Sequence, residues 1–423
     1  MNSSDRDALA SPWTIVIALS LLLGLQPIAT DLYLPALPQM RAELGWLASE
    51  ATWTLTALIL AFGVAQLVWG PVADRLGRKP VLLSGLSLFV IASGMTMASG
   101  SLATMVMARA LQGASLAASV VCGRAMIRDL YPPEEGARVM AKAMAGLGVL
   151  ALTGPFLGSY SAVHGGWRAS LGVVAAFGVI TALYVWLRLP ETWPAHRRHA
   201  AVGVRELVGQ WTHIARQPIF RAHALLTACT YGGLYAYLAL SAFVFIDTLG
   251  ISRPQYGLLM ASISLVYIVG TQVCRVALQR VGLVGTVRVA GWLSLSAMVC
   301  LATVIAWQLW LQHSGARHVP TWALLPGMWL YGLAHGIHQP CGQTGVVSAF
   351  PKQAGAASAL AGFTLSTCAV GVGALLSAWT AHPHFHDAFF PMTVGMMVGA
   401  ALTCHMALGR VQRDGAPPDA LPA

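Results

Sequence analysis

Charge is scarce in this chain of 423 residues: only 9% of them are Asp, Glu, Lys or Arg, against roughly 25% in an ordinary soluble domain. Hydrophobic residues make up 57%. A soluble globule of this composition could not cover its surface with polar groups. The shortage of charge therefore excludes that class and predicts an all-α membrane protein that crosses the bilayer several times.

Recognisable catalytic and metal-binding patterns are also missing. The sequence contains no HExxH pair and no nucleophile elbow, so we expect no metal site, no cofactor and no enzyme. We expect the cysteines to be small packing residues because they fall in or beside apolar stretches without CxxC spacing. There are seven of them: Cys122, Cys229, Cys274, Cys300, Cys341, Cys368 and Cys404.

What the chain does have is about twelve apolar runs, each of roughly 18 to 27 residues and long enough to span a bilayer as a helix. We read the first as an uncleaved span and not as a signal peptide, because it is too long and its amino-terminal flank is not basic. The runs are 12–34, 51–72, 80–99, 102–123, 139–162, 170–187, 223–246, 256–273, 289–311, 321–347, 355–379 and 388–407.

The Lys and Arg residues predict the orientation. With the amino terminus in the cytoplasm, roughly 20 of the 25 basic residues fall on the inner side. An even number of spans then places both termini in the cytoplasm. The net charge of +10 follows from this topology, so we expect no nucleic-acid partner. The basic residues left on the outer side are Arg41, Arg168, Arg253 and Arg317.

A polar connection divides the runs into two sets of six. We expect residues 1–190 to form an amino-terminal bundle, 191–220 a cytoplasmic linker, and 221–423 a carboxy-terminal bundle with a short tail. "DRLG" at Asp74 to Gly77 recurs as "QRVG" at Gln279 to Gly282. Parallel repeats of this kind are typical of transporters, whose substrate site lies between the halves.

Two charges stand inside spans. Asp31 follows an uncharged stretch from Ala8 to Thr30, and Arg109 is the basic residue deepest in any run. Charges at such depth are costly and usually functional. Asp31 lies about 28 Å along its helix at 1.5 Å per residue, in the outer half of the span. Lipid surroundings favour a neutral carboxyl, which can exchange a proton. We therefore interpret Asp31 as the proton-exchanging group, tuned by Arg109; a purely structural pairing is the alternative.

The strongest motif is "GPVADRLGRKPVLL", from Gly70 to Leu83. Gly77 permits a tight turn between two helices, and Gly70 permits close helix approach. The motif resembles the loop between the second and third helices of the major facilitator superfamily, with Val72 as the one departure. The resemblance implies twelve helices in two six-helix bundles.

In that family the loop forms a latch on the inner face. The resemblance implies that Asp74 faces the amino-terminal end of the eleventh helix and that Arg78 pairs with Asp129. Arg75 completes the basic part of the motif. The latch would stabilise the outward-open form.

A second motif, "GLGVLALTGPFLGSY", resembles the fifth-helix motif of antiporters. Gly154, Pro155 and Gly158 match it, whereas Leu150 and Ser159 replace expected glycines. Small residues here also suit ordinary helix packing.

Further stretches, including "TDLYLPALPQM", "RALQGA", "GGWR" and "LPET", resemble the Bcr/CflA group of drug:proton antiporters. The resemblance implies export of bicyclomycin- or chloramphenicol-like compounds across a bacterial inner membrane, driven by the proton motive force. The expected partners are small-molecule drugs, protons and the lipid bilayer, and we expect a monomer. Substrate-contact candidates are Tyr33, Gln112, Met144, Tyr235 and Tyr237.

Other functions stay open at this point. The incomplete fifth-helix motif permits a proton-coupled importer of a small metabolite. A membrane-embedded enzyme would have to use Asp31, His335 and His338. The two histidines share a helix face at i, i+3, and they are either ionisable groups or hydrogen-bonded packing residues.

Overall fold

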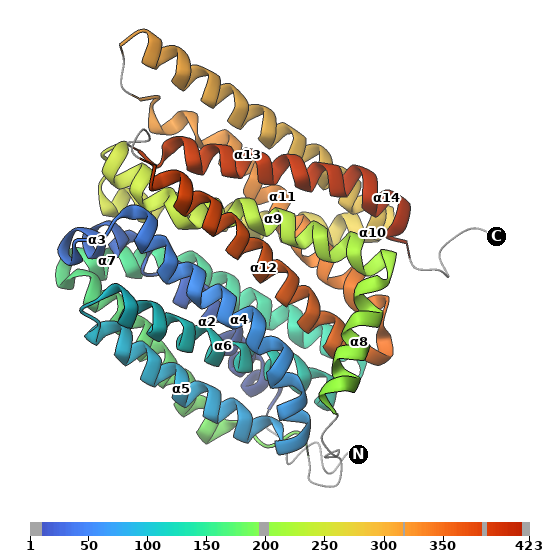
Figure 1. The fold of residues 1–423 in the computed structure, drawn as a ribbon. Coiled ribbons are helices and arrows are strands. Elements are labelled where there is room, and N and C mark those ends of the chain that lie inside the picture. The colour runs from blue at the N-terminus through green and yellow to red at the C-terminus, as the bar shows by residue number, and fades with distance from the viewer. Residues whose placement is uncertain (1–10, 194–202, 316–317, 383–386, 417–423) are drawn as a thin grey trace. The chain divides into compact units, whose positions relative to one another are not determined.

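The computed structural model describes residues 11–193, 203–315, 318–382 and 387–416. Part of the expected linker, 194–202, and the tail from 417 onward lie outside this range. Every regular element in the described part is helical (Figure 1). The α-helices are α2 (Pro12–Asp31), α3 (Leu37–Leu44), α4 (Ala48–Leu76), α5 (Arg78–Ala98), α6 (Leu102–Leu130), α7 (Pro133–Arg188), α8 (Val204–Arg216), α9 (Pro218–Ala242), α10 (Arg253–His313), α11 (Leu325–Ser348), α12 (Ala354–Thr380), α13 (Phe389–His405) and α14 (Val411–Asp414).

Short helical turns connect several of these helices. Two are π-helical, η3 and η6, and the others are single 3₁₀ turns. Their bounds are η1 (Leu34–Ala36), η3 (Phe243–Thr248), η4 (Thr321–Ala323), η5 (Pro351–Gln353) and η6 (Met406–Arg410).

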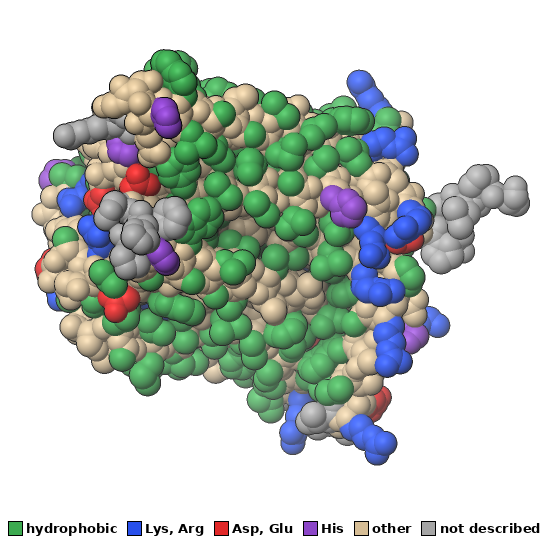
Figure 2. All heavy atoms as spheres, turned by 45° about the horizontal axis from the view of Figure 1, so that its top comes forward, with side chains coloured by type: hydrophobic (Ala, Val, Ile, Leu, Met, Phe, Trp, Pro, Cys, Tyr) green, Lys and Arg blue, Asp and Glu red, His purple; other side chains and the backbone are tan. Residues whose placement is uncertain are grey.

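Nine helices in the described residues are long and apolar enough to cross a membrane. Their outward side chains include many large hydrophobic ones, such as Leu375 at 73% exposure, which suits lipid and not water. Figure 2 shows a largely hydrophobic surface, with Lys and Arg gathered at the edge of the view where α14 ends. The chain is a multi-pass membrane protein.

Two of these helices are too long for one crossing. At 1.5 Å per residue, the 61 residues of α10 would span about 90 Å, three times the hydrocarbon thickness of roughly 30 Å. Each bends at a glycine with backbone angles closed to other residues: Gly166 in α7 has φ 73° and ψ −177°, and Gly282 in α10 has φ 66° and ψ −175°. The bend at Gly166 joins the apolar runs 139–162 and 170–187, and the bend at Gly282 joins the runs 256–273 and 289–311.

The repeated tetrapeptide has a structural basis. Gly77 ends "DRLG" with φ 104° and ψ 159°, and Gly282 ends "QRVG" with a similar extended, positive-φ backbone. Both glycines therefore reverse the chain between two long helices.

The chain packs into two compact units. The first comprises Met1–Ala36 and Ala57–Leu207, and the second comprises Leu37–Thr56 and Val208–Ala423. The second unit thus takes in α3 and the first part of α4, which are held to it by an ion pair of 3.3 Å between Arg41 and Asp247. The division into residues 1–190, 191–220 and 221–423 stays a prediction.

Candidate functional site

Asp31 is the last residue of α2, so the helix ends earlier than the apolar run that reaches Leu34. Pro35 explains the early end, because it has no N–H to bond the carbonyl of residue 31 one turn back. The half-buried carboxylate accepts a hydrogen bond of 2.6 Å from the Thr30 hydroxyl. Asp31 therefore stands where the helix gives way to a turn inside the first unit.

Arg109, on α6, contacts the chain on both sides of Asp31. Its Nη2 donates a hydrogen bond of 2.9 Å to the carbonyl of Ala29, and its guanidinium carbon lies 4.2 Å from the centre of the Tyr33 ring. No ion pair joins Arg109 to Asp31 within the described part of the chain. Arg109 thus contacts the chain on either side of Asp31 without a direct salt bridge to the carboxylate in the described residues.

The polar network continues from Arg109 into α5. Its Nη1 donates to Gln112 Oε1 at 2.6 Å, and Gln112 Nε2 donates to Ser93 Oγ at 2.7 Å. Arg109, Gln112 and Ser93 are completely buried. The hydrogen bonds of the network therefore offset the desolvation free energy of the buried guanidinium. Ser93 was missed at the sequence level, because nothing marks one serine of α5 as the partner of a residue on α6.

The predicted substrate residues of the first unit separate into two environments. Tyr33 and Gln112 are buried around Arg109, whereas Met144 on α7 is 41% exposed and has no part in that network. The structure thus brings two of the three together with the predicted proton-coupling residues.

The fifth-helix motif packs α7 against the same stretch of α2. A Cβ atom on Gly158 would collide with the carbonyl oxygen of Leu32, the residue after Asp31. Gly154 faces Ile28, whose Cδ1 would lie 3.5 Å from an added Cβ, and Pro155 is buried. The motif glycine at 158 therefore allows two backbones to touch beside Asp31.

The loop motif forms a charge cluster at the junction of α4 and α5. Arg78 Nε donates to Asp129 at 3.0 Å, and its Nη1 lies 2.6 Å from Asp74. The Arg78 and Asp129 side chains are only 6% and 8% exposed, whereas Asp74 is 52% exposed. Arg75 is exposed. The structure thus pairs the two residues that the family resemblance pairs, Arg78 and Asp129.

The expected close approach at Gly70 stays a prediction. The nearest atom to a Cβ on this residue would be Val121 Cγ1, at an ordinary 4.0 Å. An added methyl group at Gly70 would therefore make only an ordinary van der Waals contact among the described residues. The predicted contact of Asp74 with the eleventh helix concerns the other unit and stays a prediction.

Glu191 and Trp193 also belong to this cluster. The sequence did not single them out, although "LPET" was part of the family resemblance. The Glu191 carboxylate accepts hydrogen bonds from the backbone N–H groups of Arg78 at 3.0 Å and Lys79 at 3.2 Å, and so caps the start of α5. Trp193 Nε1 donates to the carbonyl of Asp74 at 3.0 Å, and its ring lies 4.9 Å from the Arg78 guanidinium carbon. An acid at the amino terminus of a helix stabilises it. Glu191 could not be predicted as the cap of α5 because it lies more than a hundred residues further along the chain.

The other predicted residues lie in the second unit. Tyr235 and Tyr237 are buried, and the Tyr235 hydroxyl shares a hydrogen bond with Thr56. Neither histidine of α11 contacts an acid in the described residues: His335 Nδ1 bonds the Thr230 hydroxyl at 3.1 Å, and His338 Nε2 bonds the Ser294 hydroxyl at 3.2 Å. This geometry favours hydrogen-bonded packing for both.

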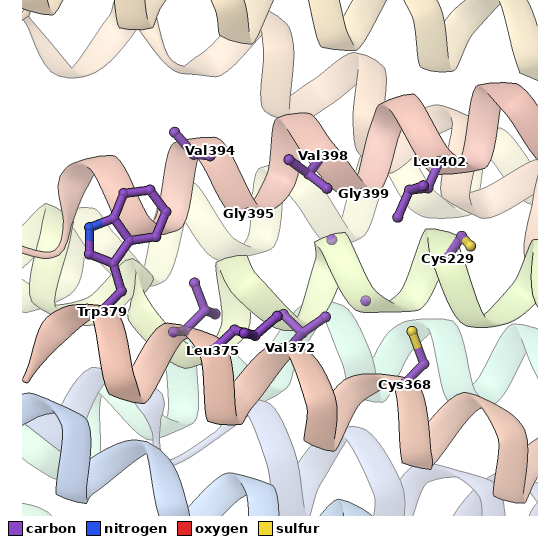
Figure 3. Close-up of a pocket in the computed structure, with 13 residues that line it drawn as sticks. Cys229, Cys368, Val372, Leu375, Trp379, Val394, Gly395, Val398, Gly399 and Leu402 are labelled. Atoms are coloured by element: carbon purple, nitrogen blue, oxygen red, sulfur yellow. The ribbon is translucent and has the colours of Figure 1, made fainter.

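A cavity of about 340 Å³ lies between α9, α12 and α13 of the second unit (Figure 3). Its walls are apolar: Leu375 of α12 lies across from Val398 and Leu402 of α13, and two glycines of α9 also line it. Because it offers almost no polar group to orient a ligand, the cavity lacks the fixed polar contacts of a specific binding site.

A model of the Major Facilitator Superfamily matches residues 19–374. The chloramphenicol resistance protein of Pseudomonas aeruginosa is 26% identical over 391 residues, covering 90% of this chain and 88% of that protein. The resemblance to this superfamily and its Bcr/CflA group is confirmed.

Other relatives align over shorter stretches. The uncharacterized MFS-type transporter YdgK of Bacillus subtilis is 30% identical over 262 residues, 60% of this chain and 65% of that protein. The bicyclomycin resistance protein homolog of Haemophilus influenzae is 26% identical over 249 residues, 58% of this chain and 62% of that protein. These two matches span less than two thirds of the relatives' length.

Among solved structures, the D-xylose-proton symporter superposes with a TM-score of 0.71 at 16% identity, over 93% of this chain and 97% of that one. At this identity the likeness shows the fold alone. The chain therefore has the all-helical transporter fold of the family.

Proposed function

Because the chain belongs to the Major Facilitator Superfamily, we propose that it is a proton-coupled drug exporter, which exchanges protons for bicyclomycin- or chloramphenicol-like compounds by alternating access. One observation carries the proposal: an acid at the broken end of a membrane helix, Asp31, lies between two contacts of a buried arginine, Arg109. Such intramembrane charges mark ion pathways.

The architecture that goes with this function has twelve spans in two bundles of six. Nine candidate spans, two of them bent at a glycine and long enough for two crossings, support eleven crossings. The 24 residues of α11, about 36 Å long, supply a twelfth. We place the protein as a monomer in a bacterial inner membrane with both termini in the cytoplasm, as the Lys and Arg distribution predicts.

Coupling requires that proton and drug compete. A ligand shifts a conformational equilibrium only through its different affinity for the two states, so a proton on Asp31 has to disfavour the drug-bound form. The Arg109 network offers a physical link, because Tyr33 and Gln112 are candidates for drug contact and also hold the cation. Drug entry would have to rearrange the contacts on both sides of Asp31.

The substrate class rests on the relatives. Two of them are named for resistance to chloramphenicol and bicyclomycin. Met144, Tyr235 and Tyr237 would add adaptable and aromatic surface. The cluster of Arg78, Asp129 and Asp74 would act as the latch of the outward-open form.

The test is proton release from the purified protein in detergent at low ionic strength when chloramphenicol is added. We expect release by the wild type, none by Asp31→Asn, and normal release by Asp247→Asn, which removes an acid of the Arg41 ion pair instead. Drug binding is measured in parallel by tryptophan fluorescence. Binding without release in the wild type would overturn exchange and favour a proton-coupled importer.

A further inference from the structure

The second copy of the repeated tetrapeptide, "QRVG", lies at the bend of α10. In the first unit, the residue that follows the tetrapeptide is Arg78, and three acids contact it: Asp74, Asp129 and Glu191. Gln279 stands where the first copy has Asp74. Arg280 stands where the first copy has the exposed Arg75, and Leu283 follows the second copy where Arg78 follows the first. The second copy thus has neither the acid nor the buried arginine of the first unit's ion pair.

Arg280 is exposed and forms no ion pair within residues 203–315, 318–382 and 387–416. The same holds for Arg275 and Arg410. The one acid recorded in an ion pair near this end of the unit, Asp414, is already bound to Arg413. This end of the second unit therefore carries an excess of positive charge that the described protein groups leave unneutralised.

Arg280 also lines a groove of about 440 Å³. Val273, Val276, Ala277 and Arg280 form one stripe along α10 at spacings of three and four residues. Val289, beyond the bend at Gly282, forms the facing wall. The groove thus occupies the angle between the two arms of α10, and the valines that line it are well exposed, with Val276 at 48%.

The groove has the dimensions and polarity of a lipid site. Arg280 lies about 10 Å along the helix from Val273, a distance well within the ~15 Å of one hydrocarbon leaflet. The guanidinium stands beside the chain-reversing turn, where a span leaves the membrane, and the valines lie deeper. A guanidinium binds a phosphate with paired hydrogen bonds, and exposed apolar walls bind an acyl chain.

We propose that this groove binds an anionic phospholipid, with the phosphate on Arg280 and one acyl chain along the valines. Basic pockets between membrane helices are known to select anionic headgroups. The site belongs to the second unit alone and does not depend on which drug is transported.

The test uses the full-length protein in detergent, loaded with dioleoyl phosphatidylglycerol or dioleoyl phosphatidylcholine, and native mass spectrometry to count retained lipids. We expect the wild type to retain phosphatidylglycerol preferentially. Arg280→Gln should weaken this retention about five-fold, as the loss of one basic contact predicts, and Val276→Trp, which fills the groove, should also lower it. Arg410→Gln is the matched control, since it removes an exposed arginine that does not line the groove.

Three results would overturn the proposal. Equal loss in Arg280→Gln and Arg410→Gln would show a general charge effect. Equal retention of the two lipids by the wild type would show that the headgroup is not recognised. Displacement of the lipid by millimolar inorganic phosphate would show an anion site without an acyl-chain groove.

Discussion

Arg109 donates a hydrogen bond of 2.9 Å to the backbone carbonyl of Ala29, two residues before Asp31. The same guanidinium lies against the ring of Tyr33, two residues after it. Arg109 thus contacts the segment that carries Asp31 but forms no salt bridge with the Asp31 carboxylate in the described residues. A direct salt bridge would have to be broken before Asp31 could exchange a proton, whereas this arrangement leaves the carboxylate bonded only to the Thr30 hydroxyl among the described residues.

The first prediction tests whether Arg109 needs its planar guanidinium group or only its positive charge. Arg109→Lys keeps the charge but cannot bond Gln112 and Ala29 through two nitrogens of a planar fork. Loss of one such hydrogen bond, worth about 1.5–3 kcal/mol, should reduce drug-evoked proton release about ten-fold or more. Arg138→Lys, at an exposed position, should behave as the wild type. Full activity of Arg109→Lys would show that charge alone suffices.

The second prediction tests the close approach of α7 to α2. Gly158→Ala should lower the Tm of the detergent-solubilised protein, because its methyl group meets the Leu32 carbonyl and overpacking costs about 1–3 kcal/mol. Gly94→Ala is the control, since a Cβ there meets no atom within 4 Å and alanine favours the helix by up to about 1 kcal/mol. Tryptophan fluorescence during heating gives both values. A Tm for Gly158→Ala at or above that of the control would contradict the contact.

The third prediction separates the two acids of Arg78. Asp129→Asn should destabilise the protein by about 3 kcal/mol, because removal of one charge of a buried pair leaves the other uncompensated. Asp74→Asn should cost less than about 1 kcal/mol, since its side chain is 52% exposed and exposed pairs contribute little. The ranking of the two Tm values is the readout. An equal loss from both would mean that burial does not set the strength of these pairs.

The fourth prediction concerns the cap that Glu191 provides for α5. Glu191→Ala removes the acceptor of the Arg78 and Lys79 N–H groups, and should cost about 0.5–2 kcal/mol, the usual value of a helix cap. Glu206→Ala, at an exposed position of α8, should change the Tm little. Hydrogen exchange at the start of α5 provides a local check, because amides freed from the cap should exchange faster. Unchanged exchange there would rule out the capping role.

The sequence by itself determined that this is a helical membrane protein of the major facilitator superfamily. Apolar run length and scarcity of charge are properties of single segments in lipid, so they need no knowledge of neighbours. Gly77 and the repeat at Gly282 were readable for the same reason, because a sharp reversal between helices demands a residue without a side chain. Asp31 and Arg109 stood out because a charge inside an apolar run has few explanations.

Only the tertiary structure decided how those residues meet. It placed Arg109 on the backbone and ring beside Asp31 instead of on its carboxylate, and it brought Glu191 to the start of a helix more than a hundred residues earlier. It also showed that Gly158 needs its small size, because a Cβ there would meet the Leu32 carbonyl. The physical reason is common to all of these. A hydrogen bond or a close contact depends on distance and direction between helices, and the pattern of one helix encodes which face it buries but not which atom of another helix lies opposite.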